Sequence, residues 1–442
     1  MIKLPEQVNK AICLLKNSGF EAYAVGGAVR DCLLGKVPFD WDITTSAHPE
    51  ETEKVFCGER IIETGIKHGT VTVIIDGMPL EITTYRIDGD YTDHRHPQTV
   101  SFSDNLRDDL SRRDFTINTL CCNCDDKIID AFGGKDDLKN KIIRCVGDPD
   151  TRFSEDALRI MRAVRFSAEL GFKIEKNTSD SILKNRQLLS DVSKERLQVE
   201  FTKLITGKYA TDVIRKYHAV IEVFIPELAP LAECEQHTKY HKYDVFEHTL
   251  HAVDAIDFND RILRLTMFFH DFGKPDAKTT DENGTSHFKG HAVISEKKTR
   301  DILKRLKFDN NTINEVSKLV LIHDMKSPRD KIQAKKMMCS LGDETYLNLI
   351  KIKRADNMAK ADPHAIDEKL KNMRSFYEEI KIDNECYNLK AHAVNGDDIK
   401  AFGIAEGKEM KSSLDFLLNG VIEGKCQNRK DVLLEYLKEN TK

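Results

Sequence analysis

The sequence has few of the features that mark a secreted or membrane protein. It contains 1 Trp, 11 Pro and 11 Cys in 442 residues, and its one tight cysteine group, Cys121, Cys122 and Cys124, has no second pair to complete a zinc site. The apolar run at 262–269 is too short to cross a bilayer and is interrupted by Arg264. No charged and then apolar leader precedes the first helical pattern. We therefore expect reduced thiols in a cytoplasmic protein with no membrane contact and no obligate protein partner.

Length and charge limit the class of protein further. Charged residues make up 32% and aromatic residues 7% of the chain, a composition typical of helix-rich soluble proteins. The 442 residues allow about three domains of ~150 residues each. A formal net charge of −5 gives no general attraction for nucleic acid, so RNA binding needs local basic patches. Residues 152–216, with 14 Lys or Arg against 9 Asp or Glu, form such a patch.

Residues 26–45, GGAVRDCLLGKVPFDWDITT, begin with an anion-binding turn. The apolar run at 22–25 predicts a short buried strand, after which the glycines open a helix. Gly26 and Gly27 let backbone amides approach a phosphate at the helix N-terminus, and Arg30 offers a second contact to the same anion. A glycine pair before a helix is also common in ordinary tight turns, so the assignment depends on the residues after the helix.

Two carboxylates come after the turn and its helix. Asp40 and Asp42 are two residues apart, so on a strand they project from the same face. Such a pair is either a solvated strand edge or a Mg²⁺ site in which carboxylate and phosphate oxygens share the metal. The neighbouring phosphate-binding turn favours the metal and predicts nucleotidyl transfer. Glu81, on a predicted hairpin at 70–86, is a candidate third carboxylate, although a polar face residue is the simpler interpretation.

These residues resemble the first motif of the bacterial class II tRNA nucleotidyltransferases, the CCA-adding enzymes of the polymerase-β superfamily, which are related to poly(A) polymerases. Residues 112–118, RRDFTIN, resemble the second motif of this family. The resemblance implies that Arg113, together with Arg112, Asp114 and Asn118, binds the triphosphate and ribose. Residues 88–100 resemble the flexible loop that is retained by enzymes able to add the terminal A.

A basic segment follows the predicted catalytic head. Residues 147–149 predict a turn, and residues 152–170 predict one helix with Ser154 as its N-cap and arginines every three residues along one face. The segment resembles the third and fourth motifs of the same family. The resemblance implies that Arg162 and Arg165 bind triphosphate and ribose.

Asp156 and Arg159 are i and i+3 neighbours on that predicted helix. A carboxylate beside a guanidinium presents an acceptor and a donor in the order that fits the Watson–Crick edge of C or A, and not that of U or G. We expect this pair to select the base, with Glu155 bracing it. The simpler interpretation is an ion pair within the helix, worth about 0.3–0.5 kcal/mol.

A second polar constellation lies beyond residue 235. Its members occur in helical contexts in an order that resembles the HD phosphohydrolase superfamily, where His, His-Asp and a distant Asp bind a divalent metal. They are His248, His270, Asp271, His291, His323 and Asp356. The resemblance implies a transition-metal site with phosphohydrolase activity. The alternative is a helical body in which these polar residues only form hydrogen bonds and ion pairs with one another.

We expect an α+β protein with a small polymerase-β-like nucleotidyltransferase head on a mixed β-sheet, at residues 1–147. An all-α, base-selecting neck at 148–225, an HD body at 226–365 and a tRNA-binding helical tail at 366–442 would follow.

The resemblance implies template-independent addition of C, C and A to the 3′ end of tRNA from CTP and ATP, with release of pyrophosphate, by two Mg²⁺ ions held by Asp40 and Asp42. The alternatives are an enzyme that adds only the terminal A, a poly(A) polymerase, an HD phosphohydrolase with a degenerate head, and a non-catalytic RNA-binding protein.

Overall fold

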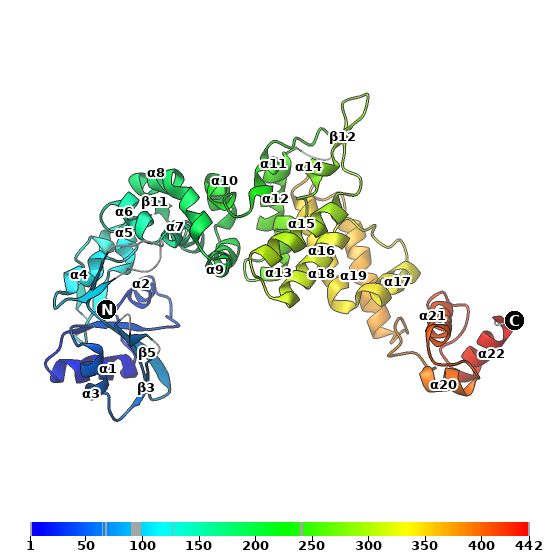
Figure 1. The fold of residues 1–442 in the computed structure, drawn as a ribbon. Helices are drawn as coiled ribbons and strands as arrows, with labels where there is room; N and C mark the ends of the chain where they lie inside the picture. The colour runs from blue at the N-terminus through cyan, green and yellow to red at the C-terminus, as the bar shows by residue number, and fades with distance from the viewer. Residues whose placement is uncertain are drawn as a thin grey trace. The chain divides into compact units, whose positions relative to one another are not determined.

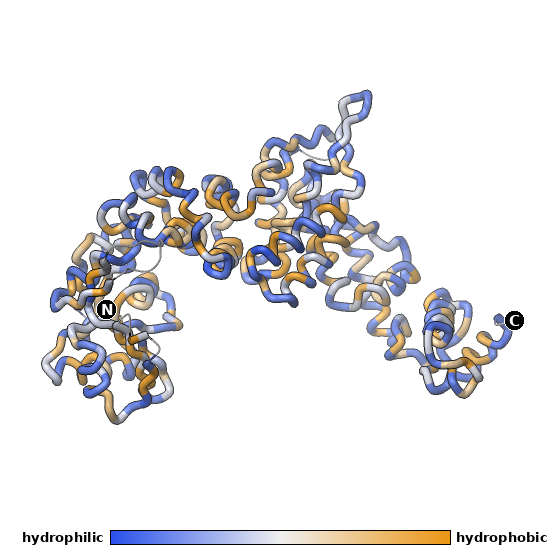
Figure 2. Tube along the Cα trace, viewed as in Figure 1, coloured by the Kyte–Doolittle hydropathy of each residue, from blue (hydrophilic) through white to orange (hydrophobic). Residues whose placement is uncertain are grey.

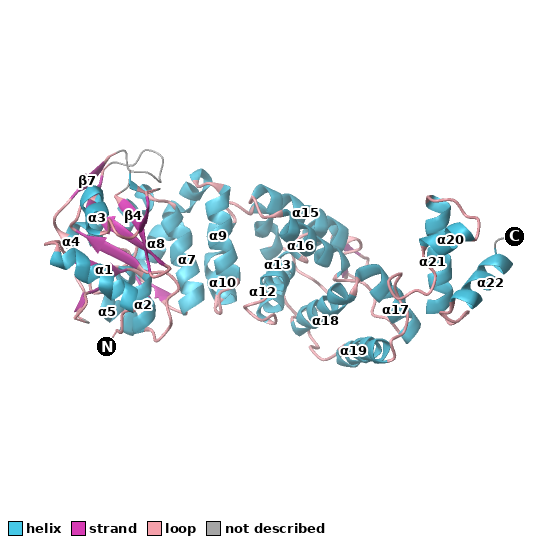
Figure 3. Ribbon diagram, turned by 90° about the horizontal axis from the view of Figure 1, so that it is seen from below, coloured by secondary structure: helices cyan, strands magenta, loops and turns pink. Residues whose placement is uncertain are grey.

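The computed structural model describes residues 2–63, 65–66, 69–89, 99–125, 127–238 and 242–440. The chain divides into two compact units, one of residues 1–229 with 305–307 and one of residues 230–304 with 308–442. The main β-sheet lies in the first unit, whereas the second unit is mainly helical (Figures 1 and 3). The expected α+β class with a mixed sheet is confirmed. The finer division into head, neck, body and tail stays a prediction.

Within the described residues, seven strands form one mixed sheet in the order β3-β4-β5-β2-β1-β8-β9. They are β1 (Ala22–Val25), β2 (Asp42–Thr45), β3 (Arg60–Ile62), β4 (Thr70–Ile75), β5 (Met78–Thr84), β8 (Cys121–Cys122) and β9 (Ile128–Ile129). The β2 and β5 strands are parallel, and the other neighbours are antiparallel. The predicted β4–β5 hairpin turns at Asp76 and Gly77, whose φ values of 48° and 81° suit a two-residue hairpin turn.

Helices pack around this sheet and continue beyond it in the first unit. They are α1 (Glu6–Asn17), α2 (Gly27–Leu33), α3 (Pro49–Val55), α4 (Leu106–Ser111), α5 (Gly134–Asn140), α6 (Pro149–Glu155), α7 (Leu158–Leu170), α8 (Lys176–Asn185), α9 (Lys194–Ile205) and α10 (Ala210–Ile221). The apolar stripe that predicts α1 is fully buried at Val8, Ile12 and Leu15, as a period of 3.6 requires.

The predicted single helix at 152–170 is wrong. The chain forms α6 and then α7, with Asp156 between them in an extended conformation at φ −133° and ψ 100°. Asp148 caps α6, because its carboxylate accepts a bond from the backbone N–H of Thr151, and Pro149 occupies the first helical position. A capping carboxylate followed by proline is a stronger start signal than Ser154, which instead donates to the Thr151 carbonyl.

Two further local predictions need correction. Residues 142–146 carry Ile142, Ile143 and Val146 and predict a strand that closes the sheet, but they do not join it; instead β10 (Ile142–Ile143) pairs in parallel with β11 (Lys173–Ile174). Asp40 precedes β2 rather than lying on it, since the strand begins at Asp42. The loop predicted at 88–100 connects the paired strands β6 (Arg86–Asp88) and β7 (Val100–Phe102), and its residues 90–98 lie outside the described part of the chain.

The second unit consists of helices and one short hairpin. Its elements are α12 (Val245–Asp254), α13 (Arg261–Phe269), α14 (Lys274–Ala277), β12 (Thr279–Thr280), β13 (Ser286–His287), α15 (His291–Arg305), α16 (Asn310–Ile322), α17 (Lys331–Leu341), α18 (Asp343–Met358), α19 (Asp367–Ile382), α20 (Gly396–Ala401), α21 (Lys408–Ile422) and α22 (Lys430–Asn440). A separate small core around Leu417 and Leu433 holds the last three helices together.

Hydrophobic and hydrophilic segments alternate along the whole trace (Figure 2). This alternation is the pattern of amphipathic helices that bury one face. None of the helices in the described ranges combines the length and apolar character needed to cross a membrane.

Candidate functional site

Sheet register gathers carboxylates in the first unit. Asp42, the first residue of β2, lies opposite Glu81 of the parallel strand β5. The tip of Asp42 reaches solvent, yet the surrounding protein removes much of its water. This desolvation raises the pKa of Asp42, and Glu81 and Asp40 raise it further, whereas Arg113 lowers it. Neighbouring negative charges that raise the pKa of Asp42 are an environment that a bound cation relieves, so the site suits a hard divalent metal.

The glycine turn closes over this group. Gly26 has φ 83° and ψ −136°, a backbone conformation that L side chains rarely adopt. A Cβ atom at this position would lie 3.3 Å from Arg113 Nη1 and 4.0 Å from Asp42 Oδ2. Arg30 is buried, and its Nη1 donates to Asn118 Oδ1 at 2.8 Å. The structure therefore brings the predicted turn, carboxylate and second-motif residues together, with Arg30 bonded to Asn118.

Sequence reasoning missed the residue that fixes the arginines. Asp109, in α4, is fully buried, and its Oδ1 accepts from Arg112 Nε at 3.0 Å and Nη2 at 2.6 Å. Its Oδ2 accepts from Thr44 Oγ1 at 3.0 Å and from Arg113 Nη2 at 3.3 Å. Burial alone raises the pKa of Asp109, but Arg113 and Arg112 outweigh it and lower the pKa. The i,i+3 and i,i+4 spacing to the two arginines was the available signal.

Asp114 joins the second motif to α7. Its Oδ2 accepts from Arg162 Nε at 2.9 Å and Nη2 at 2.7 Å, and its Oδ1 accepts from Asn118 Nδ2 at 2.9 Å. Burial alone raises the pKa of Asp114, but Arg162 and Asn118 outweigh it and lower the pKa to about 2. Arg165 is buried beside Arg162 and pairs with Glu200 at 2.6 Å. Carboxylates thus hold these two predicted nucleotide-binding arginines in place.

Asp156 and Arg159 have separate partners among the described residues. Asp156 Oδ2 lies 3.0 Å from Arg196 Nη2, on α9. Arg159 donates from Nη1 to Glu155 Oε2 at 2.7 Å and from Nη2 to the Arg112 carbonyl at 2.8 Å. The break between α6 and α7 explains this arrangement, because the helical spacing that would pair the two side chains is absent. Glu155 braces Arg159, while Arg196, a second residue that sequence reasoning did not assign to the site, braces Asp156.

The second unit brings all six residues of the predicted metal site together. They are His248 on α12, His270 and Asp271 directly after α13, His291 at the start of α15, His323 directly after α16, and Asp356 on α18. They form two triads that share Asp271: one with His248 and His270, and one with His291 and His323. Within each triad the ligand atoms lie within 4.8 Å of one another. Asp356 Oδ1 lies 3.0 Å from His248 Nε2.

All four histidines of this cluster direct Nε2 inward, because Nδ1 faces a backbone carbonyl. The Nδ1–carbonyl distances are 3.2 Å for His248, 2.6 Å for His270, 2.8 Å for His291 and 2.6 Å for His323. A carbonyl only accepts, so Nδ1 carries the proton, and Nε2 of a neutral ring presents a lone pair. The facing Nε2 atoms are 3.3 Å apart in one triad and 3.1 Å apart in the other. Lone pairs at that distance repel unless a proton or a metal cation lies between them.

Charges in the cluster shift its pKa values in opposite directions. Burial alone lowers the pKa of His270, but Asp271 and Asp356 outweigh it and raise the pKa to about 9. Burial lowers the pKa of His323 to about 3, and the neighbouring histidines His270 and His291 act in the same direction. Burial alone raises the pKa of Asp271, but His270 and Lys274 hold it well below its usual range. A metal would have to displace the proton that the raised pKa leaves on His270, after which imidazole nitrogens and ionised carboxylates form a donor set that suits a transition metal.

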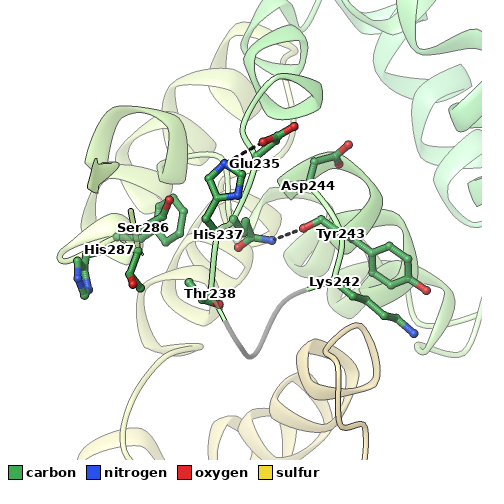
Figure 4. A pocket seen from close by; sticks show the side chains of 11 residues that line it. Glu235, His237, Thr238, Lys242, Tyr243, Asp244, Ser286 and His287 are labelled. Atoms are coloured by element: carbon green, nitrogen blue, oxygen red, sulfur yellow. Dashed lines mark hydrogen bonds and ion pairs between the residues drawn. The ribbon is translucent and has the colours of Figure 1, made fainter. Parts of the chain in front are cut away.

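A pocket of about 1080 Å³ adjoins the cluster (Figure 4). Figure 4 shows His237 turned toward Glu235, and its Nε2 lies 2.8 Å from Glu235 Oε2. Lys274 connects the pocket lining to the cluster, because its Nζ donates to Gln236 Oε1 at 2.6 Å and lies 2.7 Å from Asp271 Oδ2. Phe288 lines both this pocket and a smaller hollow of about 380 Å³ over the cluster.

Comparison with known proteins agrees with the first site. A family model described as the poly A polymerase head domain matches residues 22–144, and one described as a probable RNA- and SrmB-binding site of polymerase A matches residues 171–231. A third, described as tRNA nucleotidyltransferase domain 2, putative, matches residues 279–437. The head fold and its group of carboxylates and arginines define a nucleotidyltransferase.

Relatives that match over the whole length identify the family. The CCA-adding enzyme of Ligilactobacillus salivarius (strain UCC118) is 34% identical over 444 residues, which cover 99% of this chain and 97% of that protein. The CCA-adding enzyme of Lactobacillus helveticus (strain DPC 4571) is 51% identical over 211 residues, or 47% of this chain and 52% of that protein. The crystal structure of the Bacillus stearothermophilus CCA-adding enzyme in complex with CTP is 30% identical, with a TM-score of 0.72 over 98% of this chain and 96% of that one. The chain belongs to the family of CCA-adding enzymes.

Proposed function

We propose that this chain adds C, C and A to the 3′ end of tRNA from CTP and ATP, without a nucleic acid template, in the bacterial cytoplasm. The observation that carries the proposal is the convergence of Asp42, Glu81 and Arg113 under the glycine turn at Gly26. The relative solved with CTP supports that nucleotide, and the matching tRNA nucleotidyltransferase model supports tRNA as the acceptor. An A-adding-only enzyme and a poly(A) polymerase remain the alternatives within the class.

The reaction joins the tRNA 3′-hydroxyl oxygen to the α-phosphorus of the nucleotide and breaks the bond to pyrophosphate. Asp40 and Asp42 would hold Mg²⁺, which stabilises negative charge on the attacking and leaving oxygens when it is bound. Arg113, held by Asp109, offers donors to the triphosphate beside Asp42. Arg162, oriented by Asp114, extends the same positive surface from α7.

The base would be chosen by protein hydrogen bonds. In our proposal, Asp156 accepts from the amino group of C or A, and Arg159 donates to the adjacent ring nitrogen. Arg196 and Glu155 support the proposal because each braces one of the two side chains by an ion pair. Uracil and guanine would leave a carbonyl facing the Asp156 carboxylate, which is unfavourable.

The catalytic assignment is tested by Asp42→Asn, which removes a charged metal ligand at nearly constant volume. We expect incorporation of labelled CTP into tRNA lacking its CCA end to fall by at least a hundredfold, with an unchanged melting temperature. The matched control is Asp76→Asn in the β4–β5 turn of the same sheet, which should retain activity. Near wild-type incorporation by the Asp42→Asn protein would show that the metal assignment is wrong.

We propose metal-dependent phosphoester hydrolysis as a second activity, in the second unit. The observation that favours it is the pair of triads that share Asp271, in which imidazole nitrogens and carboxylate oxygens lie within 4.8 Å of one another. His248, His270 and Asp356 would hold one transition-metal ion, His291 and His323 would hold another, and Asp271, which belongs to both triads, would contribute to each. Such ions would supply an activated water for attack on phosphorus. Lys274 and Lys360, which lie beside Asp271 and Asp356, offer positive charge to the phosphate.

Metal content tests this second activity separately from catalysis. We expect about two transition-metal ions per chain by elemental analysis of the purified protein, and hydrolysis of a phosphoester such as a 2′,3′-cyclic nucleotide. His270→Ala should lose metal and hydrolysis but keep CTP incorporation. His287→Ala, an exposed histidine outside the cluster, is the matched control. If the purified protein binds no transition metal and cleaves no phosphoester, the proposal of a second activity is wrong, and the proposal of CCA addition is unaffected.

A further inference from the structure

Two apolar side chains beside the carboxylates have almost no packing partners in the folded chain. Phe39 is 98% exposed and Val37 is 95% exposed. Among the large hydrophobic side chains of the described residues, the next most exposed is Ile382, at 77%. Single exposed hydrophobic residues are ordinary, but here the two most exposed ones lie two positions apart in one short loop. This loop, residues 36–41, connects α2 to β2.

The loop is held before these residues by a bond of 2.9 Å from the Lys36 N–H to the Asp31 carbonyl, and after them by the buried Trp41. Trp41 follows with 5% exposure, and Pro38 restricts the backbone between the two exposed side chains. Phe39 immediately precedes Asp40, and consecutive Cα atoms are ~3.8 Å apart. The backbone of Phe39 therefore lies directly beside Asp40, one of the carboxylates proposed to hold the metal. Because it buries almost no surface within the chain, the Phe39 ring contributes little to folding through packing.

We propose that Phe39, supported by Val37, forms an apolar platform on which the base of the 3′-terminal tRNA nucleotide stacks. The inference rests on the proposed nucleotidyl transfer, because that reaction brings the terminal 3′-hydroxyl to Asp40 and Asp42. The base of the same nucleotide must then lie within one nucleotide's length of these carboxylates, and an exposed aromatic ring is available there.

Stacking suits the binding of the 3′-terminal base, because this base changes from one addition to the next. The terminal base differs between tRNAs before the first addition, and it becomes C after each of the first two additions. A site that recognised the terminal base by hydrogen bonds would favour one of these bases and reject the others. Every base has a π-face, so an aromatic platform accepts them all, and base stacking on an aromatic residue is sequence-tolerant. The incoming base, in contrast, is selected by polar groups at Asp156 and Arg159.

The test combines a change in the protein with a change in the RNA. Phe39→Ala and wild-type proteins extend two acceptors with CTP: tRNA ending just before the first added C, and the same tRNA with an abasic terminal nucleotide. For wild type, we expect kcat/KM for the abasic acceptor to fall roughly 5- to 150-fold, the range of stacking on one aromatic side chain. Phe39→Ala should lose a similar factor on normal tRNA and show almost no further loss on abasic tRNA. Phe39→Trp should restore discrimination.

Controls separate this inference from the proposed function. Phe258→Ala removes another exposed phenylalanine, in the second unit, and should extend both acceptors like wild type. The KM for CTP should be unchanged by Phe39→Ala. If the wild type adds no CTP to tRNA, the proposed function fails. If the wild type adds CTP but Phe39→Ala discriminates against the abasic acceptor as strongly as wild type does, or raises only the KM for CTP, the platform is wrong and the proposed function stands.

Discussion

Base selection gives the sharpest prediction. Asp156 and Arg159 each have their own ion-pair partner in the structure, so the role of Asp156 can be tested by itself. Asp156→Asn keeps the size of the side chain, and its amide oxygen still accepts from Arg196, which lies 3.0 Å from the carboxylate in the wild type. The substituted amide now offers a donor where the carboxylate only accepted. It can therefore bond the O4 carbonyl of uracil, so we expect UTP to be incorporated relatively better even though total activity falls.

The magnitude depends on burial. The side chain of Asp156 is 19% exposed, so the contact is largely shielded from water. An unmatched polar edge in such a site costs about 1–3 kcal/mol, which corresponds to roughly a 5- to 150-fold preference. The ratio of kcat/KM for CTP to that for UTP should fall by a factor in this range in Asp156→Asn.

The assay uses single-nucleotide addition to tRNA that ends one position before the first added C. Arg196→Ala is the matched control, because it removes the brace and keeps the carboxylate. It should lower kcat/KM for CTP and UTP by similar factors and leave their ratio nearly unchanged. An unchanged ratio in Asp156→Asn would refute the reasoning and place base selection elsewhere.

The contacts give three further predictions. Asp109→Asn replaces the charged partner of Arg113, so the KM for CTP in tRNA extension assays should rise about tenfold or more, since bonds to charged groups are worth about 1.5–3 kcal/mol. Asp114 has a folded pKa of about 2, below the ordinary value of 3.8. Its contribution to stability, about 2 kcal/mol, is therefore present above pH 4 and is lost as the pH falls toward 2. Urea unfolding should show Asp114→Asn less stable than wild type at pH 7, with the difference shrinking toward pH 2. His323→Ala should lower metal content from about two ions to one per chain, measured by elemental analysis, without changing CTP incorporation.

Local signals predicted most of the first site. The glycine turn, the β4–β5 hairpin and the second motif are each encoded within a few neighbouring residues, and the structure places them as expected. The six residues of the metal cluster lie far apart in the chain. The adjacent pair His270-Asp271 and the helical context of the other four residues were the signals that identified them. The resemblance to the HD phosphohydrolase superfamily implied that these six residues come together, and the structure brings them together.

The supporting residues could not be predicted in the same way. Arg196 meets Asp156, which is 40 residues away in the chain, only after folding. The i,i+3 and i,i+4 spacing of Asp109 to its two arginines is shared by many ordinary helical ion pairs, so it does not by itself mark a functional site. The break at Asp156 depends on Asp148 and Pro149 starting a helix earlier than Ser154 suggested, so an apolar period that continues across the break was misleading. The β10–β11 pair likewise joins segments thirty residues apart, for which a short apolar run gives no register.

The central claim is that this chain builds the complete CCA end by itself. The direct measurement is to incubate the purified protein with tRNA lacking its last three nucleotides and to sequence the 3′ ends after reaction with CTP alone, ATP alone, or both. We expect addition of two C residues with CTP alone, little addition with ATP alone, and CCA followed by arrest with both nucleotides. Runs of A with ATP alone, or no addition until a CC end is supplied, would contradict it.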